Sequence, residues 1–270
     1  MTKINNSLML ITGGASGIGL LLGQMALSQG ASGLIIWDSH PTKLKAAAEL
    51  LSQDGQAVYP MQTDVSLPES VQASLVKCMD AGLVPDIIVL NAGVVTGKFF
   101  VDHHIDDINR TLGVNVLGCM LVAKAFLPAM TQRRSGHIVT IASAAGMLAN
   151  PRMSVYAASK WAVLGWSESL RLEMKALKTG IRVTTVTPSY IDTGMFQGAR
   201  VNFLLPLMKP EKAARKIISG VVHNRIFVRM PALVYLLPLF KGILPVSWFD
   251  FLVGKLLGVY KSMDHFTGHA

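Results

Sequence analysis

Three side chains, Ser143, Tyr156 and Lys160, have the types and the spacing needed to move a proton onto or off an alcohol oxygen. Tyr156 and Lys160 are four residues apart in an amphipathic stretch, so on a helix they share one face. A phenol with a pKa of about 10 is a poor base at neutral pH, but a neighbouring ammonium group favours the phenolate. Ser143 could then hold and polarise the substrate oxygen. The pattern predicts general acid–base catalysis by Tyr156.

Other interpretations of these and nearby residues account for fewer features of the sequence. A tyrosine and a lysine at this spacing also occur on ordinary surface helices, but that does not account for Ser143. A serine can be the nucleophile of an acyl transfer, but Ser143 lacks the Gly-x-Ser-x-Gly turn of such enzymes. His103 and His104 are adjacent, so their side chains point in different directions, and no further ligands cluster near them in the sequence. We expect no metal site.

A glycine-rich string from Thr12 to Gly19, TGGASGIG, follows the first apolar run and opens a helical pattern. Gly13 permits a tight turn, while Gly17 and Gly19 let the backbone approach a pyrophosphate at the start of the helix. A glycine turn without a ligand is the alternative, but both position and spacing favour a dinucleotide. We expect cofactor contacts from Gly13, Ser16, Gly17, Ile18 and Gly19.

Asp38 closes the second apolar run, about twenty residues after the glycine string, where a carboxylate can accept hydrogen bonds from ribose hydroxyls. A 2′-phosphate would meet that negative charge at close range, so Asp38 favours NAD over NADP. His40 and Lys43 soften this preference and leave NADP open. Asp38 could also cap the helix that starts near Pro41. The two roles are compatible.

Residues at the ends of two further apolar runs suit the same nucleotide site. Asp64 and Val65 follow the third run, and Asn91, Ala92 and Gly93 follow the fourth. Open α/β sheets bind ligands at the carboxyl ends of their strands. We expect Asp64 to face the adenine amino group and residues 91–93 to pass beneath the adenine and its ribose. Ordinary turn chemistry is the alternative for each alone.

Short apolar runs alternate with longer helical patterns along the chain. Continuous apolar strands between helices are typical of a parallel sheet covered on both faces. We therefore predict an α/β protein built on one doubly wound, Rossmann-type sheet, with residues 1–270 forming a single domain. The predicted strands are residues 7–12, 33–38, 57–62, 86–90, 137–143, 181–187 and 225–228, and the predicted helices are 17–28, 42–52, 68–82, 105–130, 155–178 and 211–223.

The positive net charge of +9 is concentrated in the last quarter of the chain. Residues 1–199 carry 15 basic and 13 acidic side chains, whereas residues 200–270 carry 10 and 3. That quarter is also strongly apolar, which fits a membrane surface better than a nucleic acid. Cys78 and Cys119 lack metal-type spacing and suit a reducing compartment, and the polar amino terminus lacks a signal peptide. We expect a cytoplasmic protein that does not bind nucleic acid.

The apolar tail has three open interpretations. Charged residues interrupt it before any stretch reaches the length of a membrane span. We therefore predict a hydrophobic helical extension within residues 200–270 that lies on a bilayer, covers an apolar substrate pocket, or forms a dimer surface. The first two interpretations are compatible with each other.

The glycine string, Asp38, the Asn-Ala-Gly at 91–93, Ser143 and the YAASK segment together resemble the short-chain dehydrogenase/reductase family across nearly the whole chain. The resemblance implies an oxidoreductase in which Asn115 joins the catalytic group and holds a water for proton relay to Lys160. It also implies that Pro188, Ile191 and Thr193 cradle the nicotinamide, that Tyr156 and Lys160 touch the cofactor, and that the protein forms a homodimer or homotetramer. Ser189 departs from the family's usual glycine, which puts the local loop path in question.

The tail and the segments KAFLPAM and GHIVTIASAAG resemble the branch of that family that contains hydroxysteroid and retinol dehydrogenases. Members of this branch usually carry an amino-terminal hydrophobic anchor, for which we find no equivalent stretch. The resemblance implies an apolar secondary alcohol or ketone, or a retinoid-type alcohol or aldehyde, as the substrate. Two alternatives remain open. One is an NADPH-dependent carbonyl reductase, and the other is a nucleotide-binding scaffold on a lipid surface with little turnover.

Overall fold

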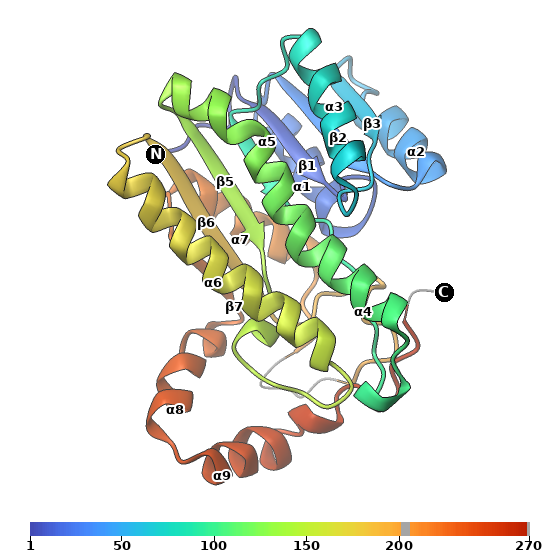
Figure 1. Ribbon diagram of the computed structural model, residues 1–270, viewed down its shortest axis with the longest axis vertical. Helices are drawn as coiled ribbons and strands as arrows, with labels where there is room; N and C mark the ends of the chain where they lie inside the picture. Colours follow the sequence, from blue (N-terminus) through green and yellow to red (C-terminus); the bar gives the residue numbers. More distant parts are fainter. Residues whose placement is uncertain (201–205, 269–270) are drawn as a thin grey trace.

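A single seven-stranded parallel sheet forms the centre of the computed structural model, which describes residues 1–200 and 206–268 (Figure 1). Its order is β3-β2-β1-β4-β5-β6-β7, so the chain reverses direction across the sheet between β1 and β4. This confirms the predicted doubly wound architecture. The strands are β1 (Leu8–Thr12), β2 (Gly33–Asp38), β3 (Val58–Gln62), β4 (Ile87–Leu90), β5 (Gly136–Ile141), β6 (Ile181–Pro188) and β7 (Phe227–Met230).

The strands are continuous apolar runs because the central ones are buried on both faces. Every residue of β2 and β4 is buried, and Leu10 of β1 pairs with Ile35 on one side and Ile88 on the other. β3 lies at the edge, where Pro60 is tolerated and most side chains are partly or fully exposed. Burial therefore falls from the middle of the sheet to this edge.

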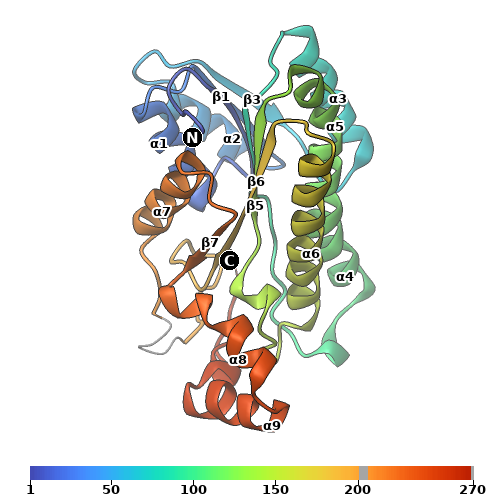
Figure 2. The ribbon, with the colours of Figure 1, turned by 90° about the vertical axis from the view of Figure 1, so that its left-hand side faces the viewer.

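Helices cover both faces of the sheet (Figure 2). On one face α1 (Gly17–Ser28), α2 (Pro41–Leu51) and α7 (Pro210–Val222) bury Leu22, Leu44 and Ile217 in one core. On the other, α3 (Pro68–Asp80), α5 (Gly118–Arg133) and α6 (Ser154–Ala176) bury Val71, Phe126 and Leu170 in a second core. The two cores hold the carboxyl ends of the strands at one common edge.

Most predicted boundaries agree with the structure to within two residues, and three differences are informative. The predicted helix over 105–130 is divided into α4 (Ile105–Leu112), a π-helical turn at Gly113–Leu117 and α5. β5 ends at Ile141, so Ser143 lies beyond the strand and directly before a 3₁₀ turn at Ala144–Gly146. β7 starts at Phe227, two residues later than predicted. The first two exceptions occur at the site described below.

The helical run from Ile105 to Arg133 has the length and apolar composition of a membrane span. Within this fold it is a core helix, because Val122, Phe126 and Met130 are fully buried against the sheet. A helix that covers one face of a parallel sheet needs the same apolar composition as a helix that spans a membrane.

The hydrophobic helical extension follows β7 and projects from the carboxyl edge of the sheet (Figures 1 and 2). Its inner side packs Val234, Leu237, Phe249 and Val253 against the segment after β5, including Met147. In addition, Lys241 Nζ donates to the Met147 carbonyl at 3.1 Å and lies 4.1 Å from the ring centre of Trp161. Its elements are 3₁₀ turns at Ala232–Tyr235 and Val259–Lys261, α8 (Leu237–Ile243), α9 (Val246–Phe249) and a π-helical turn at Asp250–Leu256.

Candidate active site

The glycine string forms a tight turn between β1 and α1 that leaves no room for side chains. Gly13 and Gly17 have φ angles of +61° and +53°, in the left-handed region that favours glycine. A Cβ added to Gly19 would lie 2.2 Å from the Gly13 carbonyl oxygen. The turn leads directly into the first turn of α1, whose amides have no acceptor within the helix, as an anion site requires.

Two residues of the glycine string that carry longer side chains, Ser16 and Ile18, differ in how they could contact an anion. Ser16 is exposed and stands directly before α1, and within residues 1–200 its hydroxyl makes no capping bond to the helix. The hydroxyl is therefore available to a ligand. Ile18 is buried in the core beneath α1, so only its backbone could contribute.

Thr12 and Asn91 hold the turn from below. The Thr12 hydroxyl oxygen accepts hydrogen bonds from the backbone amides of Asn91 and Ala92, at 3.0 and 3.1 Å. Asn91 Nδ2 donates in return to the carbonyls of Thr12 and Gly13, at 3.0 and 3.1 Å. The Asn91 side chain thus fixes the shape of the turn, and the part of this segment left for a ligand is its backbone.

Asp38 braces the same turn at the end of β2. Its side chain is buried, with Oδ2 accepting from the Ala15 amide at 3.2 Å and Oδ1 from the His40 amide at 3.0 Å. The residue directly before α2 is His40, so Asp38 is not the cap of that helix. Each carboxylate oxygen keeps a further lone pair, which can accept from a hydroxyl donor such as a ribose.

Asp64 and Val65 lie at the carboxyl end of β3. Asp64 Oδ1 accepts from the amide and the hydroxyl of Ser66, at 2.9 and 2.6 Å. Val65 is buried against α5, where a Cβ on Gly118 would lie 2.7 Å from Val65 Cγ2. The Val65 side chain therefore positions the loop, and the half-buried Asp64 remains at its surface.

The expected proton-transfer residues come together at the carboxyl edge of β4 and β5. Ser143, Tyr156, Lys160 and Asn115 are all at least nine-tenths buried. Ser143 Oγ accepts from the Ala145 amide at 3.1 Å and donates to the Pro188 carbonyl at 3.5 Å. Lys160 Nζ lies 5.6 Å from the centre of the Tyr156 ring. Residues predicted from three separate segments thus share one enclosed site.

Burial dominates the proton affinity of these groups. It raises the pKa of the Tyr156 phenol well above its ordinary value, while a hydrogen bond with Ser143 acts in the opposite direction. Burial also lowers the pKa of Lys160, whose ammonium group donates to the Ile141 carbonyl at 2.9 Å. The expected lowering of the tyrosine pKa by the lysine is not seen in this arrangement. In this arrangement the Tyr156 side chain is therefore a protonated phenol at neutral pH.

Asn115 lies in the π-helical turn, and its side-chain amide makes three hydrogen bonds. Oδ1 accepts from the Val94 amide at 2.8 Å, while Nδ2 donates to the Val94 carbonyl and to Ser159 Oγ, both at 2.9 Å. These bonds tie the helix to the loop after β4. Because the amide is used in this way, it is a clamp in this arrangement, and a relaying water would need the second lone pair of Oδ1 or the backbone of Asn115. π-Helical turns of this kind are frequent at functional sites.

Gly93 lies between the clamp and the lysine. A Cβ at this position would be 3.4 Å from Asn115 Oδ1 and 3.6 Å from Lys160 Nζ, which is ordinary van der Waals contact. A methyl group would therefore fit, but it would occupy the space between the two side chains. The absence of a side chain keeps that space free for a small molecule.

Comparison with known proteins identifies the chain. A family model described as short chain dehydrogenase matches residues 7–202. The chain is a short-chain dehydrogenase/reductase. It is 37% identical to epidermal retinol dehydrogenase 2 of Mus musculus, over 98% of this chain and 87% of that protein. It is 32% identical to estradiol 17-beta-dehydrogenase 11 of Homo sapiens, over 94% of this chain and 84% of that protein.

Solved structures of the family superpose on this dehydrogenase over most of its length. A short-chain dehydrogenase/reductase from Burkholderia phymatum in complex with NAD has a TM-score of 0.81 at 24% identity, covering 94% of this chain and 96% of its own. One from Sphingobium yanoikuyae in complex with NADPH has a TM-score of 0.75 at 26% identity, covering 94% and 95%. The predicted family, fold and NAD(P) chemistry are confirmed. The protein is an NAD(P)-dependent oxidoreductase that acts on a small-molecule substrate.

The residues of this dehydrogenase fit a dinucleotide. The turn at residues 13–19 offers a side-chain-free approach to amides, and Asp38 stands at its edge with an acceptor for a ribose hydroxyl. On the opposite side, a Cβ on Gly17 would meet Thr193 Cβ at 3.4 Å. The loop with Ile191 and Thr193 therefore reaches across to the glycine turn. Ser189 donates its amide to the Met230 carbonyl at 2.8 Å, which fixes the path of the loop after Pro188.

Several contributing residues were not predicted. Ser159 accepts from Asn115 and donates to the Tyr156 carbonyl at 2.7 Å, so it links two members of the site, and its place inside the YAASK segment was the available signal. Thr12 is the first residue of the glycine string, and its hydroxyl accepts hydrogen bonds from two backbone amides. Met263 packs in one apolar cluster with Tyr156, although more than 100 residues separate them, and no local pattern points to that contact.

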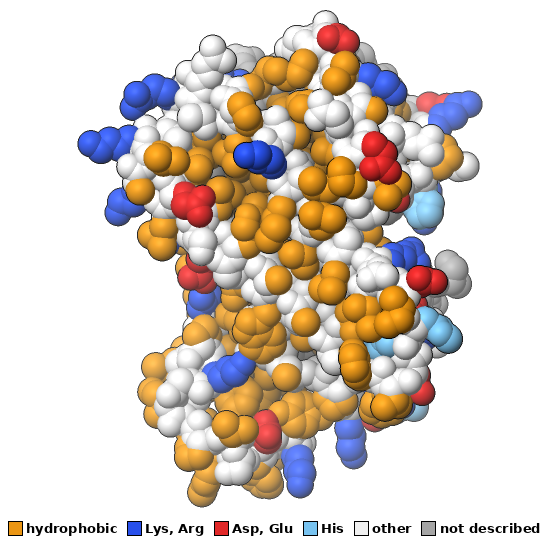
Figure 3. Space-filling view, in the orientation of Figure 1, with side chains coloured by type: hydrophobic (Ala, Val, Ile, Leu, Met, Phe, Trp, Pro, Cys, Tyr) orange, Lys and Arg blue, Asp and Glu red, His pale blue; other side chains and the backbone are white. Residues whose placement is uncertain are grey.

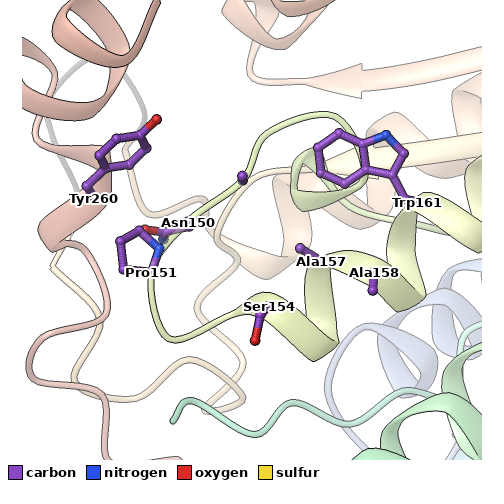
Figure 4. A pocket seen from close by; sticks show the side chains of 8 residues that line it. Asn150, Pro151, Ser154, Ala157, Ala158, Trp161 and Tyr260 are labelled. Carbon is purple, nitrogen blue, oxygen red and sulfur yellow. The ribbon is translucent and has the colours of Figure 1, made fainter. Parts of the chain in front are cut away.

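A shallow depression of about 480 Å³ lies on the outer side of α6, away from the catalytic face (Figure 4). Ser154, Ala157 and Trp161 come from one side of the helix, whereas Tyr156 and Lys160 come from the other. Asn150, Pro151 and Tyr260 close its far side. Its position separates it from the proton-transfer group.

Proposed function

We propose that this dehydrogenase transfers a hydride between NAD(H) and an apolar secondary alcohol or ketone, or a retinoid-type alcohol or aldehyde, of steroid, retinoid or other lipid-like structure. The observation that carries the proposal is the apolar surrounding of Tyr156. Tyr156 clusters with Met153 and Met263, and the ring of Phe196 meets the Tyr156 ring edge-on at 5.9 Å between ring centres. A polar substrate would lose its hydration there without compensation. The retinol and steroid dehydrogenases among its relatives are consistent with such a substrate.

The preference for NAD rests on Asp38. Its carboxylate is fixed by two backbone amides at the end of β2, so it cannot swing away from a 2′-phosphate. Two negative charges held at close range in a partly buried site repel strongly. Hydroxyl groups at the same place would instead donate to the carboxylate.

We propose catalytic roles for Ser143, Tyr156, Lys160 and Asn115. In oxidation, Ser143 holds the substrate oxygen, Tyr156 Oη takes its proton, and the carbinol hydrogen leaves as a hydride. In reduction, the phenol returns the proton to the carbonyl oxygen. Lys160 holds the nicotinamide ribose and stabilises the phenolate as it forms, and Asn115 clamps the helix that carries this edge of the site. The bound nicotinamide supplies the hydride acceptor or donor.

We assign each part of the cofactor to its own group of residues. The turn residues Gly13, Ser16, Gly17, Ile18 and Gly19 meet the pyrophosphate, Asp38 the adenosine ribose, and Asp64 the adenine, with Val65 and residues 91–93 alongside. Pro188, Ile191 and Thr193 hold the nicotinamide, together with Tyr156 and Lys160.

The experiment is a panel of sterols, retinol and fatty alcohols, and their carbonyl forms, assayed with each cofactor. We expect turnover of at least one ring-bearing apolar substrate, with a higher kcat/KM for NAD(H). A higher kcat/KM for NADP(H) would contradict the role of Asp38. Bound cofactor without turnover of any substrate would favour a lipid-surface scaffold.

We also propose that the chain is one continuous domain. Of the expected extension over residues 200–270, α7 and β7 belong to the core, and the part after β7 holds this cytoplasmic enzyme peripherally on a membrane. Hydrophobic side chains gather over the extension at the lower end of the molecule, with Lys and Arg side chains around them (Figure 3). Ile243, Val246 and Trp248 are 70%, 76% and 64% exposed. Apolar side chains surrounded by basic ones bind an anionic bilayer surface.

Flotation with anionic liposomes tests the membrane contact. Ile243→Glu combined with Trp248→Glu should reduce the bound fraction severalfold. Leu177→Glu is the matched control, since Leu177 is also 70% exposed but follows α6 at the opposite end of that helix from the extension. Equal binding of the double variant and the control would exclude this surface.

A homodimer or homotetramer is proposed through the outer faces of α5 and α6. Leu117 before α5, and Trp161 and Leu172 on α6, are exposed apolar residues on this side, and the depression in Figure 4 lies beside Trp161. Light scattering of the purified protein gives the oligomeric state directly. A monomer at micromolar concentration would contradict the proposal.

A further inference from the structure

Residues 259–267, near the end of the described chain, turn back from the extension toward the loop after β6. We call this segment the strap. Its backbone is tied to the loop after β6, because the Arg200 amide donates to the Ser262 carbonyl at 2.8 Å and the Thr267 amide donates to the Gln197 carbonyl at 3.0 Å. These bonds lay the strap along the loop that follows the predicted nicotinamide cradle.

Polar side chains pin the strap to a second loop. Ser262 Oγ lies 2.8 Å from the Tyr190 hydroxyl and accepts from Asn150 Nδ2 at 2.8 Å. Asn150 belongs to the loop after β5 and Tyr190 to the loop after β6. Ser262 is 3% exposed, so these bonds are formed inside the protein. Hydrogen bonds in such a place are costly to leave unmade.

The apolar side chains of the strap face the catalytic tyrosine. Met263 is 1% exposed and packs in the cluster of Tyr156 and Met153. Phe196 joins the same cluster and meets Tyr190 edge-on at 5.1 Å between ring centres. Tyr156 itself is only 4% exposed. The strap thus contributes part of the cover over the catalytic tyrosine.

Phe266 extends this cover to a third loop. Its ring lies so close to Gly97, in the loop after β4, that a Cβ on Gly97 would be 2.1 Å from the ring. Phe266 also packs against the cluster that contains Met263. The strap therefore contacts the loops that follow β4, β5 and β6, all at the catalytic edge of the sheet.

We propose that Met263 and Phe266 contact the apolar body of the substrate and set the size of the ring system that reaches Tyr156. The inference rests on the proposed function, since it names residues that select among apolar alcohols. A substrate oxygen must approach the buried Tyr156 hydroxyl, and these two side chains pack in the apolar cluster that covers it. Met263 and Phe266 are specificity-determining residues, and proton transfer stays with Tyr156.

The test compares cyclohexanol with decahydro-2-naphthol, a fused-ring secondary alcohol, as substrates with NAD. Shortening Met263 to alanine should raise the ratio of kcat/KM for the larger over the smaller alcohol by at least about fivefold, because a few methylene groups in an apolar pocket change selectivity by this order. The matched control is Met174→Ala, which truncates another buried methionine in the core beneath α6. It should leave the ratio within about twofold.

The outcomes separate the two proposals. If the wild-type enzyme binds NADH but oxidises neither alcohol nor any larger one, the proposed function fails. Calorimetric binding of the fused-ring ketone to the NADH complex then tests the strap without turnover, and Met263→Ala should tighten it. If Met263→Ala does not fold, Phe266→Ala carries the same test. An unchanged ratio and unchanged ketone binding in a folded variant would overturn the inference.

Discussion

The proposed cofactor half and the proposed substrate half of this dehydrogenase are built differently. In the first, residues 12–19, Asp38 and Asn91 are joined by hydrogen bonds to backbone amides and carbonyls. In the second, Tyr156 is enclosed by apolar side chains such as Met153 and Met263, and the covering strap comes from the far end of the chain. Backbone bonding fixes one shape for a common ligand, whereas side-chain packing can vary with the substrate.

The largest expected effect of a single methyl group is in the cofactor half. Gly19→Ala would place a Cβ 2.2 Å from the Gly13 carbonyl, so the turn must open and its amides must move. We expect NADH affinity to fall by about a hundredfold or more, since the anion site depends on those amides. NADH fluorescence titration measures it.

Gly165→Ala is the control for that substitution. Gly165 lies in α6, and a Cβ there would have no neighbour within 4 Å among the described residues. Affinity should be unchanged, and the free energy of unfolding should rise by about 0.5–1 kcal/mol through helix propensity. Equal NADH affinity in the two variants would refute the role assigned to the turn.

A second prediction concerns pH and sharpens the description of the substrate half. Because burial raises the pKa of Tyr156, the phenol is protonated below that raised value and its phenolate is scarce at neutral pH. Alcohol oxidation needs the phenolate, so its kcat/KM should rise about tenfold per pH unit from pH 7 to 9. Carbonyl reduction uses the phenol and should stay nearly constant. A kcat/KM for oxidation that does not change over this range would show that the pKa of the Tyr156 phenol is not raised in the working enzyme.

A smaller effect is expected where the two halves meet. Gly93→Ala adds a methyl group in ordinary contact with Asn115 and Lys160, so the melting temperature should change little. The methyl fills the space between them, and we expect kcat to fall by about three- to tenfold, a small part of a typical proton-transfer contribution. Unchanged kcat would mean that this space has no role in proton movement.

Much of the cofactor half could be predicted because its signals are local. Glycine positions, apolar runs and an acidic residue at a strand end each reflect a constraint within a few residues. The path of β5 is an exception. Residues 137–143 are a continuous stretch of suitable residues, but pairing with β6 ends at Ile141 and leaves Ser143 to start a turn.

The substrate half could be predicted only in part, since its contacts are distant. The π-helical turn at Gly113–Leu117 has no local signature, and it is held by bonds from Asn115 to Val94 and Ser159. The contacts of Met263 and Phe266 depend on how the whole extension folds back over the sheet. Their neighbours in the chain suggested an apolar tail, and only the fold placed them beside Tyr156.

The central claim is that Tyr156 moves the proton in a hydride-transfer reaction, and Tyr156→Phe tests it most directly. Phenylalanine keeps the ring in the cluster with Met153 and Met263 and removes only the hydroxyl. With an apolar alcohol that the wild-type enzyme oxidises, kcat for NADH formation should fall by about a thousandfold or more, within the range of general acid–base catalysis, while NADH affinity stays within about twofold. Turnover close to that of the wild type, with cofactor binding intact, would contradict the account.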